Sequence, residues 1–394
     1  MLTAKKLFSL TFLGIALFSG LITVVRAARI GAPAVRLLRV PNGGIQPQIV
    51  EQDGIVHLVY FSGDAEHGDL NYVRSRDYGR TFSAPLKVNS NPGSAIAVGN
   101  IRGAQLAIGR NGRVHIAWNG SSAAQPQGPG NRPPMIYARL NDAGTAFEPE
   151  RNMIAAAWGV DGGGSLAADA HGDVYVFWHA PLPGKTGEAN RRVWMAKSTD
   201  DGKTFAREVL AFDQPTGACG CCGMRAFASA DGAIHVLFRS ATETVHRDMF
   251  LLTSNDRGRT FAGQKVSEWN IGACVMSSES FAQTAAGTLA AWESEKQVYF
   301  GRVTSDAPAS PVSAVGAPGT GENRKYPWLA VNPAGDTLFV WTENMAWKKG
   351  GSVAWQVYDR DLKPQGPMGR SDGVPVWSLV ASFAKPDGSF AVVF

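Results

Sequence analysis

The 394-residue sequence has no run of basic residues and no basic stretch interleaved with aromatics, so it lacks the pattern of a nucleic-acid-binding surface. Charged residues are sparse, at 18%, and the formal net charge is +5. No long disordered or low-complexity segment is present, although residues 120–134 form a polar insertion rich in Pro and Gly. Cysteine is limited to four residues, which do not form the two separate Cys-x-x-Cys pairs of a structural zinc site. What remains, rich in Gly and Trp, is the composition of an all-β protein.

The amino terminus predicts export. Lys5 and Lys6 precede an apolar stretch over residues 7–25, and small residues follow it. This order is typical of a secretory signal peptide over residues 1–27. The stretch is also long enough to span a bilayer, so an uncleaved amino-terminal anchor is the alternative. Either way, we expect the body of the protein, residues 34–394, to be one domain in an exported compartment, periplasmic or secreted. The full chain has 38 basic and 33 acidic residues. Cleavage would remove three of the basic residues and leave 35 against 33, so the mature protein would be nearly neutral.

Three segments share the pattern Ser-x-Asp-x-Gly-x-Thr-Phe, at residues 75–82, 198–205 and 254–261. The Asp side chain can accept hydrogen bonds from nearby backbone amides, and the Gly can adopt a positive φ. Each segment therefore predicts a turn between two antiparallel strands. Because the pattern recurs, it also predicts an array of similar units.

A wider repeat places a tight turn between two apolar strands, as in Asp53-Gly54 and Asn111-Gly112. Seven glycines mark these turns: Gly54, Gly112, Gly172, Gly232, Gly287, Gly335 and Gly388. Their spacings of 48 to 60 residues fit one four-stranded antiparallel blade each. We therefore predict a β-propeller with seven blades rather than six. The last copy, residues 378–394, has two strands, so we expect residues 34–40 to add a strand to it and close the ring.

The three Ser-x-Asp-x-Gly-x-Thr-Phe segments resemble the Asp-box, or BNR repeat, of the sialidase (neuraminidase) superfamily of β-propellers. The resemblance implies an exo-sialidase-like glycoside hydrolase with its site at the channel mouth and no required cofactor. Sialidases have six blades, so seven is a departure. A second departure is that sialidases carry Arg-Ile-Pro on the first strand, whereas this chain has Ile45-Gln46-Pro47.

Such a site needs a cationic clamp for a carboxylate beside a short proton relay. Candidates for the substrate clamp, near the start of the inner strands, are Arg102, Arg225 and Arg324. Candidates for nucleophile, neighbouring acid and acid/base are Tyr326, Glu279 and Asp64, with Asp69 as the alternative to Asp64.

The cysteines are Cys219, Cys221, Cys222 and Cys274. Counted from the turn glycines, Cys219 and Cys274 occupy equivalent positions on neighbouring blades. In an exported compartment this predicts two disulfides, one linking blades four and five and one local. The alternative is a soft-metal site in which thiolates, with Met224 or Met276, bind Cu(I) or a similar ion.

Two classes of function follow. The first is a monomeric, exported propeller that recognises or hydrolyses a glycan, an acidic sugar or another acidic small ligand. The second is a non-enzymatic scaffold that binds an envelope protein, a peptide or a soft metal ion. The fold supports either class, because propellers host many functions.

Overall fold

Strands make up almost all of the regular structure in residues 31–304 and 312–394, the part of the chain that this computed structural model describes. The predicted signal peptide or anchor over residues 1–27 lies outside the described residues. Within the described part, no helix is both long and apolar enough to cross a membrane. Three single 3-10 turns interrupt the strands, at Pro41–Gly43, Arg110–Gly112 and Glu188–Asn190.

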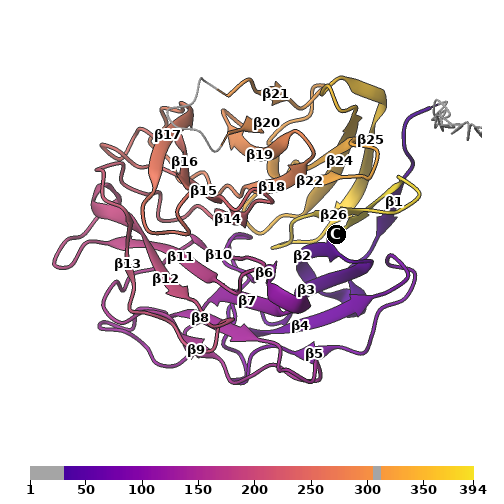
Figure 1. The fold of residues 1–394 in the computed structure, drawn as a ribbon. Helices are drawn as coiled ribbons and strands as arrows, with labels where there is room; N and C mark the ends of the chain where they lie inside the picture. The colour runs from indigo at the N-terminus through magenta and orange to yellow at the C-terminus, as the bar shows by residue number, and fades with distance from the viewer. Residues whose placement is uncertain (1–30, 305–311) are drawn as a thin grey trace, which may run out of the picture. The chain divides into compact units, whose positions relative to one another are not determined.

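The described residues form seven sheets arranged as the blades of a propeller (Figure 1), which confirms the predicted fold and blade number. Each of the first three blades has four antiparallel strands: β2 (Ile45–Gln52), β3 (Ile55–Gly63), β4 (Gly68–Ser75) and β5 (Leu86–Lys87); β6 (Gln105–Ile108), β7 (Val114–Asn119), β8 (Met135–Arg139) and β9 (Arg151–Asn152); β10 (Gly164–Ala168), β11 (Val174–Pro181), β12 (Arg191–Ser198) and β13 (Val209–Phe212).

Blades four to six have the same order: β14 (Met224–Ala228), β15 (Ile234–Arg239), β16 (Met249–Ser254) and β17 (Ala262–Ser267); β18 (Ser280–Thr284), β19 (Gly287–Ser294), β20 (Gln297–Val303) and β21 (Val315–Gly316); β22 (Lys325–Val331), β23 (Thr337–Glu343), β24 (Gly351–Tyr358) and β25 (Pro364–Val374). The seventh blade consists of β26 (Ala381–Ala384), β27 (Phe390–Val393) and β1 (Val35–Leu38).

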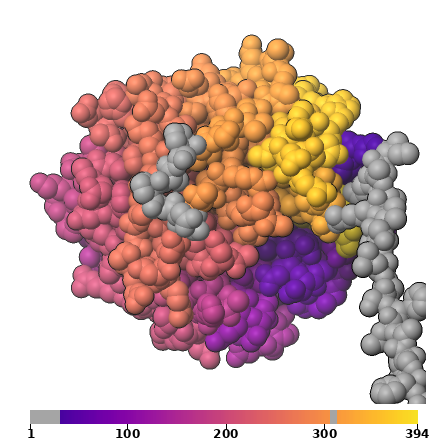
Figure 2. Space-filling view, turned by 45° about the horizontal axis from the view of Figure 1, so that its top comes forward, coloured from indigo at the N-terminus to yellow at the C-terminus, as the bar shows by residue number. Residues whose placement is uncertain are grey.

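The two ends of the described chain close the ring, as the sequence predicts. β1 pairs with β27, from Val35 opposite Phe390 to Leu38 opposite Val393. In the space-filling view, the yellow end of the chain lies beside the indigo beginning (Figure 2). The closing blade has three strands rather than four, and β1 runs parallel to β27. No hairpin joins these two strands, so an antiparallel arrangement is not imposed on them.

The first strand of each blade lies innermost, and each inner strand contacts the inner strands of its neighbours around the ring. The tryptophans near the end of the second strands are fully buried in the clusters that join adjacent blades: Trp118, Trp178, Trp292 and Trp341. Blade packing therefore fixes the inner strands, and these position the channel and its mouth.

The three repeated segments form turns that follow the third strands β4, β12 and β16. In the turn of blade three, Asp200 Oδ1 accepts a hydrogen bond from the Thr204 amide at 2.8 Å, and Asp200 Oδ2 accepts one from the Thr204 hydroxyl at 2.7 Å. Burial alone would raise the pKa of Asp200, but these hydrogen bonds outweigh it and lower that pKa to about 2. The carboxylate is thus a structural acceptor within the turn.

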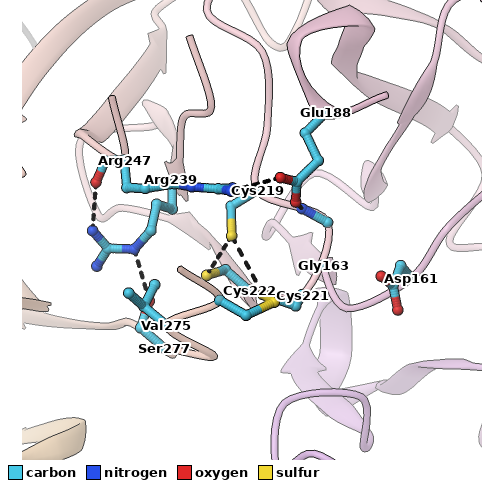
Figure 3. Close-up of a disulfide and its surroundings, with 12 residues drawn as sticks. Asp161, Gly163, Glu188, Cys219, Cys221, Cys222, Arg239, Arg247, Val275 and Ser277 are labelled. Atoms are coloured by element: carbon cyan, nitrogen blue, oxygen red, sulfur yellow. Dashed lines mark hydrogen bonds and ion pairs between the residues drawn. A yellow bond between two sulfur atoms is a disulfide. The ribbon is translucent and has the colours of Figure 1, made fainter. Parts of the chain in front are cut away.

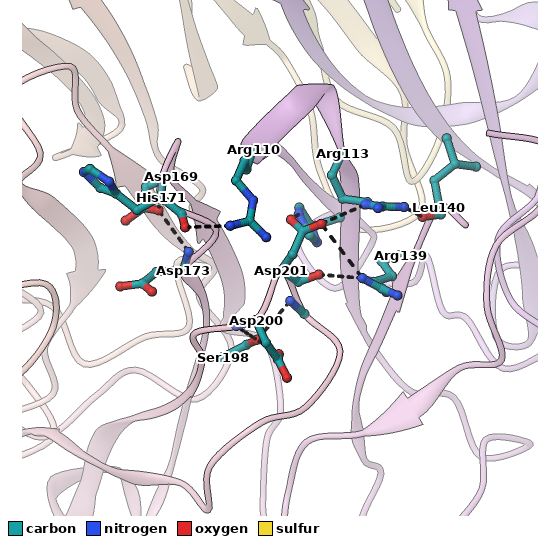
Figure 4. Close-up of polar contacts among 12 residues, drawn as sticks. Arg110, Arg113, Arg139, Leu140, Asp169, His171, Asp173, Ser198, Asp200 and Asp201 are labelled. Carbon is teal, nitrogen blue, oxygen red and sulfur yellow. Dashed lines mark hydrogen bonds and ion pairs between the residues drawn. The ribbon is translucent and has the colours of Figure 1, made fainter. Parts of the chain in front are cut away.

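The same turn also contacts the preceding blade. Asp201, next to Asp200, has φ 65° and accepts a hydrogen bond from Arg113 Nε of blade two at 3.0 Å (Figure 4). Its backbone carbonyl accepts a further bond from Arg139 Nη1 at 2.9 Å. In blade four, Arg257 has φ 60° and donates to Asp173 of blade three at 2.9 Å. The repeated turns therefore connect neighbouring blades as well as neighbouring strands.

Candidate functional site

Three of the predicted site residues line one cavity at the channel mouth: Arg225, Glu279 and Tyr326. They come from the inner strands β14 and β22 and from the segment before β18. The cavity measures about 20 Å³, which is room for roughly one water molecule. The space is therefore too small for a sugar ring, although its side chains are of the predicted types.

Arg225 lies at the base of this cavity. Its Nη1 donates to Gln48 Oε1 at 2.7 Å and to Gln105 Oε1 at 2.5 Å, and its guanidinium lies 4.6 Å from the centre of the Trp328 ring. Burial lowers the pKa of Arg225 to about 10. Arg225 and Trp328 also line the wider, mostly apolar channel below, so the two side chains separate that channel from the mouth.

Glu279 is 4% exposed, and its Oε2 has no hydrogen-bond partner among the described residues. Its Oε1 accepts a bond from the Ser277 hydroxyl at 3.4 Å. Burial raises the pKa of Glu279 well above its ordinary value, which favours the neutral acid. Burial likewise raises the pKa of Tyr326. Both groups line the cavity, and burial favours the protonated form of each.

The other two predicted clamp arginines have different partners. Arg102 pairs with Asp161, with 2.7 Å between Nη2 and Oδ1, and donates to the carbonyl oxygens of Val98 and Asp161. Arg324 is buried, with 3.2 Å between its Nε and Oε1 of Glu343. Of the three arginines, Arg225 lines the cavity, and the structure does not bring Arg102 and Arg324 to it.

The two predicted acid candidates lie on blade one and do not line this cavity. Asp64 is exposed in the loop after β3, and its Oδ1 accepts a hydrogen bond from the Glu66 amide at 2.8 Å. Asp69 on β4 pairs with Lys87, with 2.9 Å between the charged atoms. Their catalytic roles stay predictions.

Backbone strain is concentrated at the mouth. Seven non-glycine residues that line the cavity or the groove beside it have positive φ angles: Gln46 (53°), Asn100 (68°), Met276 (50°), Lys296 (63°), Asn323 (47°), Tyr326 (53°) and Trp377 (60°). This conformation is unfavourable for bulky side chains and is found preferentially at functional sites. At the mouth, therefore, tertiary packing holds several residues in backbone conformations that their side chains disfavour.

A larger depression, which we call the tryptophan groove, adjoins the cavity and has a volume of about 410 Å³. Asn100 and Tyr326 line both spaces. Three tryptophans line the groove: Trp269 before β18, Trp347 between β23 and β24, and Trp377 before β26. The Trp347 side chain is 57% exposed and packs edge-on against Trp377, with 4.7 Å between ring centres.

Charged groups lie at one side of the tryptophan groove. Lys325 Nζ lies 2.9 Å from both carboxylate oxygens of Glu293 and donates to the Val275 carbonyl oxygen at 2.5 Å. Lys296 also lines the groove, is exposed, and has no ion-pair partner among the residues that the structure describes. The groove therefore combines aromatic rings with a paired carboxylate and an available cation.

The cysteine cluster (Cys219, Cys221, Cys222 and Cys274) lies behind this groove. A disulfide joins Cys221 to Cys274 and links the segments before blades four and five, so one of the two predicted disulfides is present. Cys219 and Cys222 are buried thiols rather than a second disulfide. The Sγ atoms of Cys219, Cys221 and Cys222 lie within 4.8 Å of one another. Metal binding by this cluster stays a prediction.

Sequence reasoning missed the tryptophan groove because its rings come from connecting segments rather than from the inner strands. The alignment on turn glycines selects positions near the start of each inner strand, and of the groove residues it found Tyr326 and Cys274. Trp347 lies in the loop after the second strand of blade six, in the same phase as Asp64 in blade one. A search of these loops for exposed aromatic residues would have found Trp347.

No protein-family model matches the chain, and no curated protein matches it. Solved structures do match. One is a protein of unknown function from Dyadobacter fermentans, with a TM-score of 0.54 and 14% identity over 86% of this chain and 98% of that one. A Hadza microbial sialidase matches with a TM-score of 0.50 and 14% identity, covering 81% of this chain and 69% of that one.

A polysaccharide lyase, an ulvan lyase bound to -[GlcA(1-4)Rha3S]-, is also similar in structure. Its TM-score is 0.52 with 13% identity, over 90% of this chain and 87% of that one. At such identities the likeness concerns the propeller fold and carries no residue of a site from one chain to the other.

Proposed function

We propose that this protein is an exported propeller that recognises an acidic glycan at the mouth of its channel, in the tryptophan groove. The observation that carries the proposal is the exposed Trp347, packed edge-on against Trp377 in a space of about 410 Å³. That volume is within the range of small-molecule sites, whereas the cavity with Glu279 is not. An exposed aromatic face beside polar groups suits a sugar ring, which has one apolar and one hydroxyl-bearing surface.

The charge of the groove supports an acidic sugar. Lys296 and Lys325 are its two lysines, and Lys296 has no carboxylate partner among the described residues. A ligand carboxylate or sulfate placed near Lys296 would gain a charge-assisted contact. The names of two structural relatives, a sialidase and an ulvan lyase bound to a glucuronic acid-containing saccharide, add support from the same fold.

Binding of defined oligosaccharides tests the proposal directly. Sialylated and glucuronate-containing oligosaccharides, with neutral oligosaccharides of equal length, would be titrated while the intrinsic tryptophan fluorescence is followed. We expect saturable binding of an acidic member, weakened at least about tenfold in Trp347→Ala and in Lys296→Ala, because an aromatic contact and a charged contact are each lost.

Val209→Ala is the matched control, because Val209 is 53% exposed on β13 of blade three, far along the ring from the groove. This variant should bind as the wild type does. Absence of binding across the panel, or equal affinity in Trp347→Ala, would contradict the proposal.

Hydrolysis is a further form of the same proposal. Glu279 and Tyr326 line the cavity that adjoins the groove, and a neutral carboxylic acid is what a general acid requires. Turnover of fluorogenic sialosides and other acidic glycosides would be compared among wild type, Glu279→Gln and Tyr326→Phe. Activity in the wild type that both variants lose supports catalysis by these residues. Equal turnover in all three would contradict that role, and no turnover in any of them would leave recognition without hydrolysis.

The soft-metal alternative has one observation in its favour, the three sulfur atoms within 4.8 Å of one another. Four thiolate ligands would require prior reduction of the Cys221–Cys274 disulfide. Metal analysis of protein purified without oxygen and with a reductant decides this alternative.

Export and a monomeric state are proposed together with glycan recognition. The mass of the mature protein from the envelope fraction distinguishes cleavage near residue 27 from an anchor, and co-purification from that fraction reveals a scaffold's partner.

A further inference from the structure

The cysteine cluster combines a disulfide with two free thiols in one place. Cys219, Cys221 and Cys222 lie in the segment between β13 and β14, and Cys274 lies between β17 and β18. The Cys221–Cys274 disulfide joins residues 53 positions apart, whereas Cys219 and Cys222 are thiols. An oxidised and a reduced pair of cysteines are therefore neighbours in the same protein.

The sulfur atoms are close enough to exchange partners. The Sγ of Cys219 lies 3.6 Å from the Sγ of Cys221 and 2.9 Å from the Sγ of Cys222. Figure 3 shows the Cys219 side chain pointing at both other sulfur atoms. Cys219 thus stands between the disulfide and the second thiol.

The two pairs differ in their access to solvent. Cys219 and Cys222 are fully buried in a small apolar cluster with Trp269 and Val275. Cys274 is exposed and lines the tryptophan groove. One end of the disulfide can therefore be reached by a molecule in the groove, while the thiol pair behind it cannot.

We propose that the cysteine cluster is a thiol–disulfide relay that moves one disulfide between the groove-facing pair Cys221–Cys274 and the buried pair Cys219–Cys222. The relay goes beyond glycan recognition and does not depend on it. Its ligand class is a disulfide-bearing peptide or small molecule that enters the tryptophan groove and reaches Cys274.

The exchange needs no external electrons. The Cys219 thiolate attacks the Cys221 sulfur, so a Cys219–Cys221 bond forms, the Cys221–Cys274 bond breaks, and Cys274 leaves as a thiolate that takes up the proton lost by Cys219. The Cys222 thiolate then attacks the Cys219 sulfur, forming Cys219–Cys222 and releasing Cys221, which takes up the proton lost by Cys222. One disulfide has replaced another.

An external disulfide can then react at the groove. The Cys274 thiolate attacks it, forming a mixed disulfide and releasing one thiolate. The Cys221 thiolate attacks the Cys274 sulfur, which re-forms Cys221–Cys274 and releases the second thiolate. The external disulfide is reduced to two thiols, and the protein gains a second disulfide, so the electrons balance.

Alkylation of the native protein tests the relay without any added reductant. Full-length protein purified without oxygen is incubated with excess maleimide, and the labelled cysteines are located by mass spectrometry. We expect label at Cys274 in the wild type, because each exchange presents an exposed thiol that maleimide removes irreversibly. Cys219→Ser, which lacks the first nucleophile, should label Cys274 at least about tenfold more slowly.

Cys222→Ser gives a second readout that does not depend on how well Cys219→Ser folds. It keeps the first step, so Cys274 should still be labelled while Cys219 and Cys221 become linked. Label confined to Cys219 and Cys222 in the wild type would overturn the relay. So would a tightly bound metal ion with all four cysteines protected from maleimide, an outcome that assigns the cluster to metal binding.

Discussion

Replacement of Glu279 by glutamine tests whether the mouth holds a neutral carboxylic acid. Glu279 is 4% exposed, its Oε2 has no partner among the described residues, and burial raises its pKa well above the ordinary value. The unfolded chain releases this proton near the ordinary pKa of about 4.5, where the folded protein still holds it. Glutamine has nearly the same shape and cannot ionise.

The sign and size of the effect follow from proton linkage. The folded state binds more protons than the unfolded state above pH 4.5, so Glu279 makes the wild type less stable as the pH rises towards the folded-state pKa. The loss in the free energy of unfolding approaches about 1.4 kcal/mol per pH unit. Glu279→Gln lacks this loss. Its stability relative to the wild type should therefore increase with pH, whatever constant cost the amide adds.

Guanidinium unfolding followed by tryptophan fluorescence, repeated at half-unit steps from pH 4 to 8, measures the difference. Glu66→Gln is the control, because Glu66 is exposed on the loop after β3 and should show no such trend. A free-energy difference between Glu279→Gln and wild type that stays constant across this range would refute the reasoning. It would mean that the folded protein ionises Glu279 as readily as the unfolded chain does.

Three further predictions concern the ring and its channel. Burial lowers the pKa of His57 and of His235 to about 4, below the unfolded value of 6.5, so stability is lost as the pH falls through that interval. The expected loss is roughly 2 kcal/mol per histidine between pH 7 and pH 5, and urea unfolding of His235→Gln should show a shallower pH dependence than the wild type. Arg225→Met removes the donor for the buried Gln48 and the half-buried Gln105, so we expect a loss of about 1–3 kcal/mol in the free energy of unfolding, measured at constant pH; an unchanged midpoint would be evidence against that role. Asp200→Asn keeps the shape of the blade-three turn but weakens its bonds to Thr204, and hydrogen exchange should become faster in this turn while the other two repeated turns keep their rates.

The ring could be predicted from the sequence because it depends on repeated local features. Glycine turns recur once per blade, at spacings of 48 to 60 residues. The last copy of the wider repeat has two strands, and the predicted third strand from residues 34–40 is β1, which pairs with β27. Each turn signal is weak by itself, but its recurrence along the chain predicts one architecture.

The site was less predictable, because the position of an arginine within the blade repeat does not determine which acceptor its side chain contacts. Arg102 and Arg324 stand at the expected phase of their blades, yet one pairs with Asp161 and the other with Glu343. Arg225 reaches the cavity because Gln48 and Gln105 of blades one and two accept its hydrogen bonds. Residue type and spacing were enough to propose three arginines for the site, but the acceptors around each side chain determine which of them lines the cavity.

The division between inner strands and connecting segments explains where a ligand can bind. At the mouth, side chains from the start of the inner strands fill most of the space, and the cavity that Arg225 and Trp328 line holds about one water molecule. A group there can supply a proton or a charge but cannot surround a sugar. The connecting segments carry no such packing constraint, and they supply Trp347 and Trp377 at the rim. Specificity should therefore change with substitutions in the rim segments, whereas substitutions of Glu279 should alter chemistry without altering which ligand binds.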